Sequence, residues 1–126
     1  MRAFLCLAML VGATPVASFI YAASYAGIVS TLLLESWNGT YELSVIAENR
    51  GCGISPSWLM LNHEHNVILC LNEGVGNSNG SLTSFRMNSN GSLTSLDVVQ
   101  TLVGPVMSTM YTVPSIANHS FIPVAH

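Results

Sequence analysis

A strand-like segment occurs three times along this chain, at intervals of roughly 50 residues. The copies lie at residues 19–24 (FIYAAS), 67–72 (VILCLN) and 120–126 (SFIPVAH). An Asn-Gly pair followed by a hydroxyl residue repeats in phase with them, at 38–40 and 90–92. Repeats of about 40–50 residues with many short strands and turns are typical of β-propeller blades. The sequence therefore predicts an all-β fold built from such blades.

The repeat interval predicts an incomplete propeller. Residues 19–66 and 67–120 would form two blades, and the remaining residues would be the truncated first strand of a third blade. A propeller closes with typically about 4–8 blades of four strands each. We therefore expect residues 19–126 to be the amino-terminal part of a larger ring, because a repeat unit buries its apolar face only against its neighbours.

The first residues have the pattern of a secretory signal, which we assign to residues 1–18. Arg2 supplies the positive charge, and residues 3–13 are an apolar run within the usual length of about 7–15 residues. Pro15 would then end any helix. Small residues fit cleavage after Ser18, and cleavage after Ala17 is nearly as suitable.

Charged residues are scarce, and this excludes one class of function. The chain has three arginines, six acidic residues and no lysine, whereas nucleic-acid binding requires clusters of basic residues. No charged residue lies between Arg2 and Glu35, so a membrane anchor is the alternative to a cleaved signal. Polar and turn-forming residues interrupt this stretch, and a spanning helix needs about 20 mainly apolar residues. We expect a secreted, extracellular protein without stable membrane insertion.

Secretion changes the interpretation of the cysteines. Cys6 would leave with the signal, so Cys52 and Cys70 remain as an even pair in an oxidising compartment. We predict a disulfide between them, which would stabilise the fold by about 3 kcal/mol in the chain-entropy model. Two buried free thiols are the alternative, because Cys70 lies in a strand where small apolar residues belong.

The Asn-Gly pairs predict two hairpins, over residues 27–47 and 81–102, because Asn-Gly allows the positive φ values of a type I′ turn. In the first hairpin Tyr41, Leu43 and Val45 alternate with polar residues, which predicts one buried face and one wet face. On a secreted chain the N-x-S/T sequons are also expected glycan acceptors, provided that they lie at the surface. The sequons begin at Asn38, Asn79, Asn90 and Asn118.

A third hairpin is expected between the blades. Residues 57–61 would form a strand, residues 63–66 a polar turn and residues 67–72 the returning strand. The returning strand is apolar almost throughout, as expected for a strand that is covered on both faces. The Gly- and Pro-rich residues 50–56 would form the preceding loop.

Four segments carry a family resemblance: residues 23–27 (ASYAG), 52–59 (CGISPSWL), 69–74 (LCLNEG) and 79–82 (NGSL). They resemble the lactonase-type seven-bladed β-propeller family, which includes 6-phosphogluconolactonase-like proteins and carboxy-cis,cis-muconate cyclases. The likeness is greatest to secreted fungal members, and it covers the whole chain after the predicted signal. The third strand copy departs from the family, because it contains Pro123 and lacks the Tyr and Gly that commonly continue it.

The resemblance implies a metal-independent lactonase, which adds water to a cyclic ester, or a cycloisomerase, which forms one. No cofactor is expected, and the substrate of the full-length protein would be a small lactone or carboxylate. Either reaction needs an acid/base side chain and a cationic clamp. The matching catalytic candidates are Glu73, just past a strand end, and His126. A surface acid or turn cap is the alternative role for Glu73, and a plain terminal residue is the alternative for His126.

Clamp arginines are not evident, since Arg50 is in a loop and Arg86 is in an outer hairpin. We therefore expect the family's main acid/base and clamp residues to lie in later blades, and this chain to be catalytically incomplete by itself. A non-catalytic propeller that binds an extracellular carbohydrate or protein is the alternative function. Trp37 and Trp58 are possible sugar platforms, although burial between blades is the role we expect.

Three further features of the sequence bear on binding and association. His63-Glu64-His65 resembles a metal site, but no third ligand is evident, and a polar hairpin tip is the expected role. The glycine-rich residues 74–80 precede a strand instead of a helix, so nucleotide binding is not expected. Open blade edges predict self-association and poor solubility of the chain alone.

Overall fold

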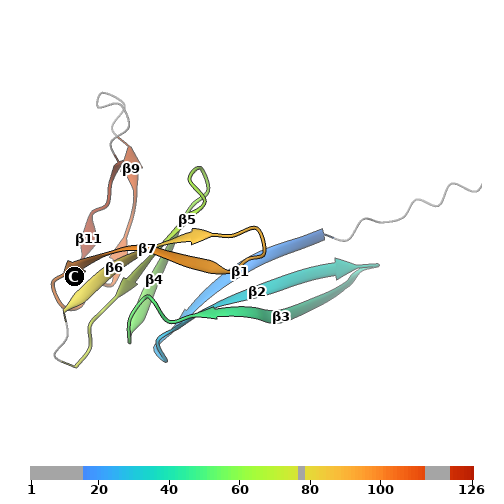
Figure 1. Cartoon of the computed structure of the whole chain (residues 1–126), viewed down its shortest axis with the longest axis horizontal. Coiled ribbons are helices and arrows are strands. Elements are labelled where there is room, and N and C mark those ends of the chain that lie inside the picture. Colours follow the sequence, from blue (N-terminus) through green and yellow to red (C-terminus); the bar gives the residue numbers. More distant parts are fainter. Residues whose placement is uncertain (1–15, 77–78, 113–119) are drawn as a thin grey trace, which may run out of the picture.

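The computed structural model describes residues 16–76, 79–112 and 120–126, which form strands, turns and loops without a helix (Figure 1). The first sheet has the order β1-β2-β3, and the second has the order β4-β5-β6-β7. Two short ladders, β9 with β10 and β8 with β11, complete the described fold. The strands are β1 (Val16–Ser24), β2 (Ile28–Trp37), β3 (Thr40–Asn49), β4 (Pro56–Asn62), β5 (Val67–Asn72), β6 (Gly80–Met87), β7 (Leu93–Thr101), β8 (Met107–Ser108), β9 (Tyr111–Thr112), β10 (Ser120–Phe121) and β11 (Val124–Ala125).

All three predicted hairpins are present, and all pairings are antiparallel. Asn38 and Gly39 have φ values of 49° and 78°, as the predicted turn between β2 and β3 requires. β5 is buried along almost its whole length, which agrees with its nearly continuous apolar sequence.

The two sheets pack face to face. Val29 from β2 forms one buried cluster with Cys52, Cys70 and Phe85. Two side chains of the first sheet also donate hydrogen bonds to the second: Thr31 Oγ1 to the Gly91 carbonyl (2.9 Å) and Asn49 Nδ2 to the Leu93 carbonyl (3.1 Å). This stacking gives the described residues their hydrophobic core.

The opposite face of the first sheet is open. Tyr41, Leu43 and Val45 are 73%, 54% and 59% exposed, so the prediction that this face is buried is wrong for the described residues. The register places Ile20 beside Leu32 and Leu32 beside Val45, on the same side of the sheet. We call this surface the open face, and it consists of Val16, Ile20, Leu32, Leu34, Tyr41, Leu43 and Val45.

The sheets are out of phase with the predicted repeat units by one strand. β4, in the predicted unit 19–66, pairs with β5 in the unit 67–120, because the tight turn at 63–66 joins them as a hairpin. The sheet boundary therefore lies in residues 50–55, between β3 and β4. β1 of the first sheet corresponds to β5 of the second, so among the described residues β1 has no hydrogen-bonded neighbour equivalent to β4.

The third strand copy is divided into β10 and β11, with Ile122 and Pro123 between them. Proline has no N–H to donate to a ladder, which accounts for the break. β10 pairs with β9 and β11 pairs with β8, so a strand-like segment that the sequence analysis did not identify precedes the copy. β4 lies near β1 of the first sheet and near β8 of the short ladders, so the second sheet lies between the first sheet and these ladders.

Candidate functional site

The connections that carry Tyr25, Arg50 and Glu73 lie at one end of the two sheets. Successive antiparallel strands reverse direction, so the β1–β2 turn, the β3–β4 connection and the β5–β6 connection emerge on the same side. Figure 1 shows these connections at the end of the fold opposite the β2–β3 turn. We call this the Glu73 end.

Glu73 follows the last residue of β5 and is fixed on both sides of its backbone. Its N–H donates to the Ser55 carbonyl (3.0 Å), and its carbonyl accepts from the Gly104 N–H (2.8 Å). The Tyr25 hydroxyl donates to Glu73 Oε1 at 2.5 Å, across 48 positions of sequence. The predicted acid is therefore paired with a tyrosine from the other sheet.

The hydrogen bond to Glu73 raises the pKa of Tyr25 above its ordinary value of 10.0, with smaller contributions from desolvation and from the negative charge of Glu73. Tyr25 therefore remains a proton donor, and the Glu73 carboxylate is the acceptor. Tyr25 was not predicted as a site residue. A signal was present, however: Tyr25 directly follows the first strand copy, as Glu73 follows the second.

Arg50 lies beside this pair. Its Nη1 donates to the Ala26 carbonyl at 3.3 Å, next to Tyr25 in the β1–β2 turn. A hollow of about 330 Å³ opens here, lined by Tyr25, Ala26, Gly27, Arg50, Gly53 and Ile54. The Glu73 end thus combines a carboxylate, a phenol and a guanidinium, which are groups suited to acid/base and anion-stabilising chemistry.

The predicted disulfide between Cys52 and Cys70 is present, with Cα atoms 5.9 Å apart. Both cysteines are buried, and the bond attaches the β3–β4 connection to β5. The neighbouring Gly53 has φ 114°, and a Cβ there would lie 2.6 Å from the Asn72 side chain. Asn72 Oδ1 in turn accepts from the Ser55 N–H at 2.9 Å. These contacts fix the backbone that carries Glu73.

His126, the second catalytic candidate, follows β11 and is exposed. The Val106 N–H donates to the carbonyl of the preceding Ala125 (2.9 Å), and Gly104 contacts Glu73, so both candidates lie near residues 104–106. No hydrogen bond or ion pair joins Glu73 to His126 in the described part of the chain. The structure pairs Glu73 with Tyr25 and leaves His126 separate.

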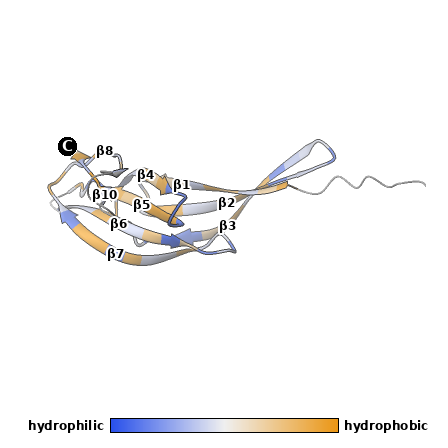
Figure 2. Ribbon diagram, turned by 90° about the horizontal axis from the view of Figure 1, so that it is seen from above, coloured by the Kyte–Doolittle hydropathy of each residue, from blue (hydrophilic) through white to orange (hydrophobic). Residues whose placement is uncertain are grey.

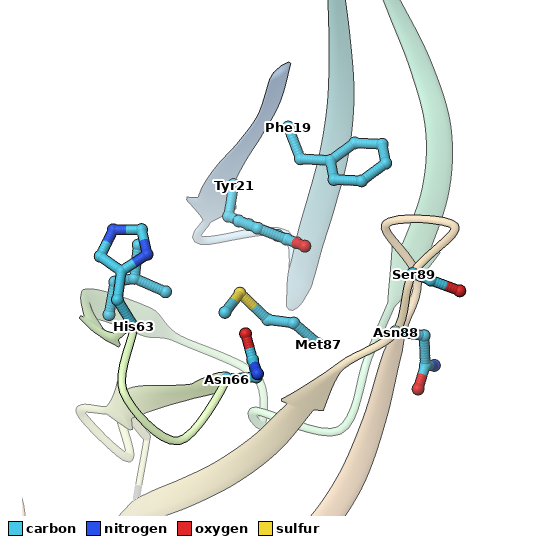
Figure 3. A pocket seen from close by; sticks show the side chains of 8 residues that line it. Phe19, Tyr21, His63, Asn66, Met87, Asn88 and Ser89 are labelled. Carbon is cyan, nitrogen blue, oxygen red and sulfur yellow. The ribbon is translucent and has the colours of Figure 1, made fainter. Parts of the chain in front are cut away.

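A second hollow, of about 460 Å³, lies at the opposite end of the sheets. Figure 3 shows Tyr21, Met87 and Asn66 around it, with Phe19 and His63 further along its wall. Burial raises the pKa of Tyr21 above 10.0. We call this space the turn-side hollow, and its lining is Phe19, Tyr21, Leu61, His63, Asn66, Met87, Asn88 and Ser89.

Other surface features follow the predictions in part. Asn38, Asn79 and Asn90 are exposed, whereas Asn118 lies outside the described residues. Trp37 and Trp58 are 57% and 37% exposed, so their expected burial between blades is wrong for the described fold. Residues 16–76, 79–112 and 120–126 contain no group of three or more side chains suited to hold a metal ion. They also contain no helix with the length and apolar character to cross a bilayer.

Comparison with known families agrees with the fold. The family described as Lactonase, 7-bladed beta-propeller matches residues 14–122. This chain therefore belongs to the lactonase seven-bladed β-propeller family, and the described residues form a propeller fragment of about two to three blades. No curated protein and no solved structure matched the chain.

Proposed function

We propose that this chain is part of a secreted propeller enzyme that opens or forms the ring of a small lactone, with Glu73 as an acid/base group. The observation that carries the proposal is the hydrogen bond from Tyr25 to Glu73, beside a hollow that Arg50 lines. Family membership supports lactone chemistry at the level of the fold. The buried disulfide and the exposed sequons are compatible with secretion.

In the hydrolytic direction, the Glu73 carboxylate accepts a proton from water as the water oxygen attacks the ring carbonyl carbon. The carbonyl oxygen becomes an oxyanion, which a guanidinium stabilises. The ring C–O bond then breaks, and the leaving oxygen takes the proton from Glu73, giving a hydroxy acid. In the cyclase reaction, a substrate carboxylate adds across a carbon–carbon double bond, and the protonated carboxyl group of Glu73 delivers a proton to the other carbon.

Tyr25 has a positioning role in this scheme, because its hydroxyl holds one carboxylate oxygen and leaves the other for the substrate. Arg50 is the cation that lines the hollow, and the remaining clamp residues are expected on other blades. We therefore expect no turnover by this chain alone. The activity belongs to a complete ring that includes these blades.

The test is hydrolysis of δ-lactones by such a ring, followed by pH-stat titration. Glu73→Gln is expected to lower kcat by about 10²–10⁴-fold, the usual contribution of an acid/base group. Glu64→Gln, at the opposite end, is the matched control and should retain full activity. Unchanged turnover in Glu73→Gln would remove this residue from the site.

A non-catalytic propeller that binds an extracellular carbohydrate is the second candidate function. The turn-side hollow favours it, because Phe19 and Tyr21 offer aromatic surface beside the polar side chains of His63 and Asn66. Binding of oligosaccharides should then be lost in Phe19→Ala and retained in Glu73→Gln. Loss of binding in Glu73→Gln with retention in Phe19→Ala would instead favour the lactone site.

A further inference from the structure

The tip of the β2–β3 hairpin joins a glycosylation sequon to an exposed aromatic ring. Asn38 and Gly39 have φ values of 49° and 78°, which is the backbone of a tight two-residue turn. Trp37, which is 57% exposed, and Thr40 are the last directly opposed pair of the two strands. The side chains of such a pair lie close together on one face of the sheet. The sequon asparagine therefore lies between the tryptophan and the hydroxyl residue that completes the sequon.

A hollow of about 590 Å³ opens beside this turn. Glu35 and Glu42 line it and are directly opposite each other, two positions along the strands from Trp37 and Thr40. Carboxylates accept hydrogen bonds without donating any, and like charges in this arrangement destabilise a strand pair. A group with an apolar face and several O–H or N–H donors is therefore suited to this space. The lining consists of Glu35, Ser36, Trp37, Asn38, Thr40 and Glu42.

The hollow lies on the side of the first sheet that faces the second sheet. Glu35 and Trp37 alternate in phase with Val29 of β2, whose side chain is buried in the junction. The second sheet extends along this side as far as its β6–β7 turn, on which the Phe19 ring packs. Figure 1 shows the end of the β2–β3 hairpin extending beyond that turn. The hollow is therefore separate from the open face, which lies on the other side of the sheet.

The corresponding sequon of the second sheet lacks this arrangement. Ser89 precedes Asn90, so no aromatic side chain stands in the position of Trp37. Asn90 Oδ1 accepts hydrogen bonds from the Ser92 N–H (3.1 Å) and hydroxyl (2.7 Å), so this side chain is used by its own turn. In the described part of the chain, no hydrogen bond of this kind engages the Asn38 side chain. Of the two hairpins, the first therefore presents its sequon asparagine beside an aromatic ring.

We propose that Asn38 carries an N-linked glycan whose first N-acetylglucosamine lies in this hollow against Trp37. The transfer forms a bond between Asn38 Nδ2 and C1 of the sugar. It breaks the bond between C1 and the diphosphate of a lipid-linked oligosaccharide, and it releases the lipid diphosphate and one amide proton. The C–H face of the sugar ring packs on the indole, and its N–H and O–H groups donate to the carboxylates of Glu35 and Glu42. The inference rests on the secretion that the proposed function includes, and it is independent of lactone chemistry.

The test is thermal unfolding of the full chain secreted from a eukaryotic host, after an endoglycosidase has trimmed each glycan to one N-acetylglucosamine and mass spectrometry has located it. Thr40→Val removes the sequon and retains a β-branched side chain, so it supplies the chain without the Asn38 sugar. We expect the sugar to raise the melting temperature by about 4 °C beside Trp37 and by less than about 1 °C in Trp37→Ala. Tyr41→Ala is the matched control, because Tyr41 is an exposed aromatic residue on the opposite face of the same hairpin. Its removal should leave the effect of the sugar unchanged.

A chain without glycans separates the sugar from the substitutions themselves. Protein secreted into the bacterial periplasm forms its disulfide without a glycan, and there Thr40→Val should change the melting temperature equally with and without Trp37. Trp37→Leu replaces Trp37→Ala if the latter is unfolded or lacks the glycan. The inference is overturned if Asn38 of the wild-type chain carries no glycan, if the sugar has the same effect in both backgrounds, or if the periplasmic protein shows the same difference. Absence of glycans at every sequon would also count against secretion, whereas a failed lactone assay leaves this inference in place.

Discussion

The two sheets are built from the same repeat but differ in what covers them. In the second sheet, β5 and the inner side of β6 are buried, with Phe85 at 0% exposure. In the first sheet, one face packs on the second sheet, and the other carries exposed apolar residues of the same strand pattern. Figure 2 shows hydrophobic residues along much of β7 as well, the outer strand of the second sheet. Equivalent strands therefore have different environments according to their place in the stack.

This difference shows that the burial of a repeat position depends on the surface that lies opposite it. Cys70 is buried and bonded to Cys52, whereas its repeat counterpart Ala22 is exposed on the first sheet. The stability of the described fold should accordingly be concentrated at the junction between the sheets. Four predictions test this, in order of decreasing effect.

Removal of the buried aromatic ring should have the largest effect. Phe85→Ala leaves a cavity in the junction and should lower the free energy of unfolding by about 3–5 kcal/mol. Tyr41→Ala, on the open face, should change it by about 0.5 kcal/mol or less. Urea denaturation of dilute protein measures both values, and equal losses would show that the open face is covered in solution.

The disulfide should contribute next. The double variant Cys52→Ala/Cys70→Ala should lose about 3 kcal/mol, because the bond restricts the unfolded chain. Hydrogen exchange should then show faster opening of β5, while β3 remains as weakly protected as before. Wild-type protein treated with a reductant is the control, and a stable reduced protein would contradict the prediction.

The cost of an alanine substitution should differ between the two hairpin glycines, because the Phe19 ring lies beside only one of them. Gly39 and Gly91 have φ values of 78° and 84°, so alanine costs roughly 1–2 kcal/mol at either position from the backbone alone. Gly91→Ala should cost about 1–3 kcal/mol more, because the Phe19 ring must move. Thermal unfolding at low protein concentration measures the difference, and Gly91→Ala/Phe19→Ala should reduce it.

The smallest effect is the pH dependence of the Tyr25–Glu73 contact. The pKa of Tyr25 is raised in the folded state, so its contribution to stability is complete below pH 10.0 and is lost as the pH rises through the folded pKa. The stability difference between wild type and Tyr25→Phe should be constant from neutral pH to pH 10.0 and shrink above it. Tyr41→Phe, at an exposed tyrosine of the open face, is the control. A difference that does not depend on pH would show that the contact is absent in solution.

Much of the fold could be predicted from the sequence because its signals are local. Asn-Gly turns determine hairpins through their φ preferences, and the apolar segment 67–72 indicates a covered strand wherever it lies. The catalytic candidate Glu73 came from the family resemblance. Its partner Tyr25 was missed because 48 positions separate them and only the packing of two sheets brings them together.

The sequence by itself determined the three hairpins, their turns and the repeat, and it predicted the pairing of Cys52 with Cys70. These follow from alternation, backbone preference and an even cysteine count, none of which requires a partner sheet. Only the tertiary structure decided that β4 joins the second sheet, that Tyr25 meets Glu73, and that Tyr41, Leu43 and Val45 face outward. Burial depends on which surface lies opposite, and a strand's own residues do not encode the presence of that neighbour.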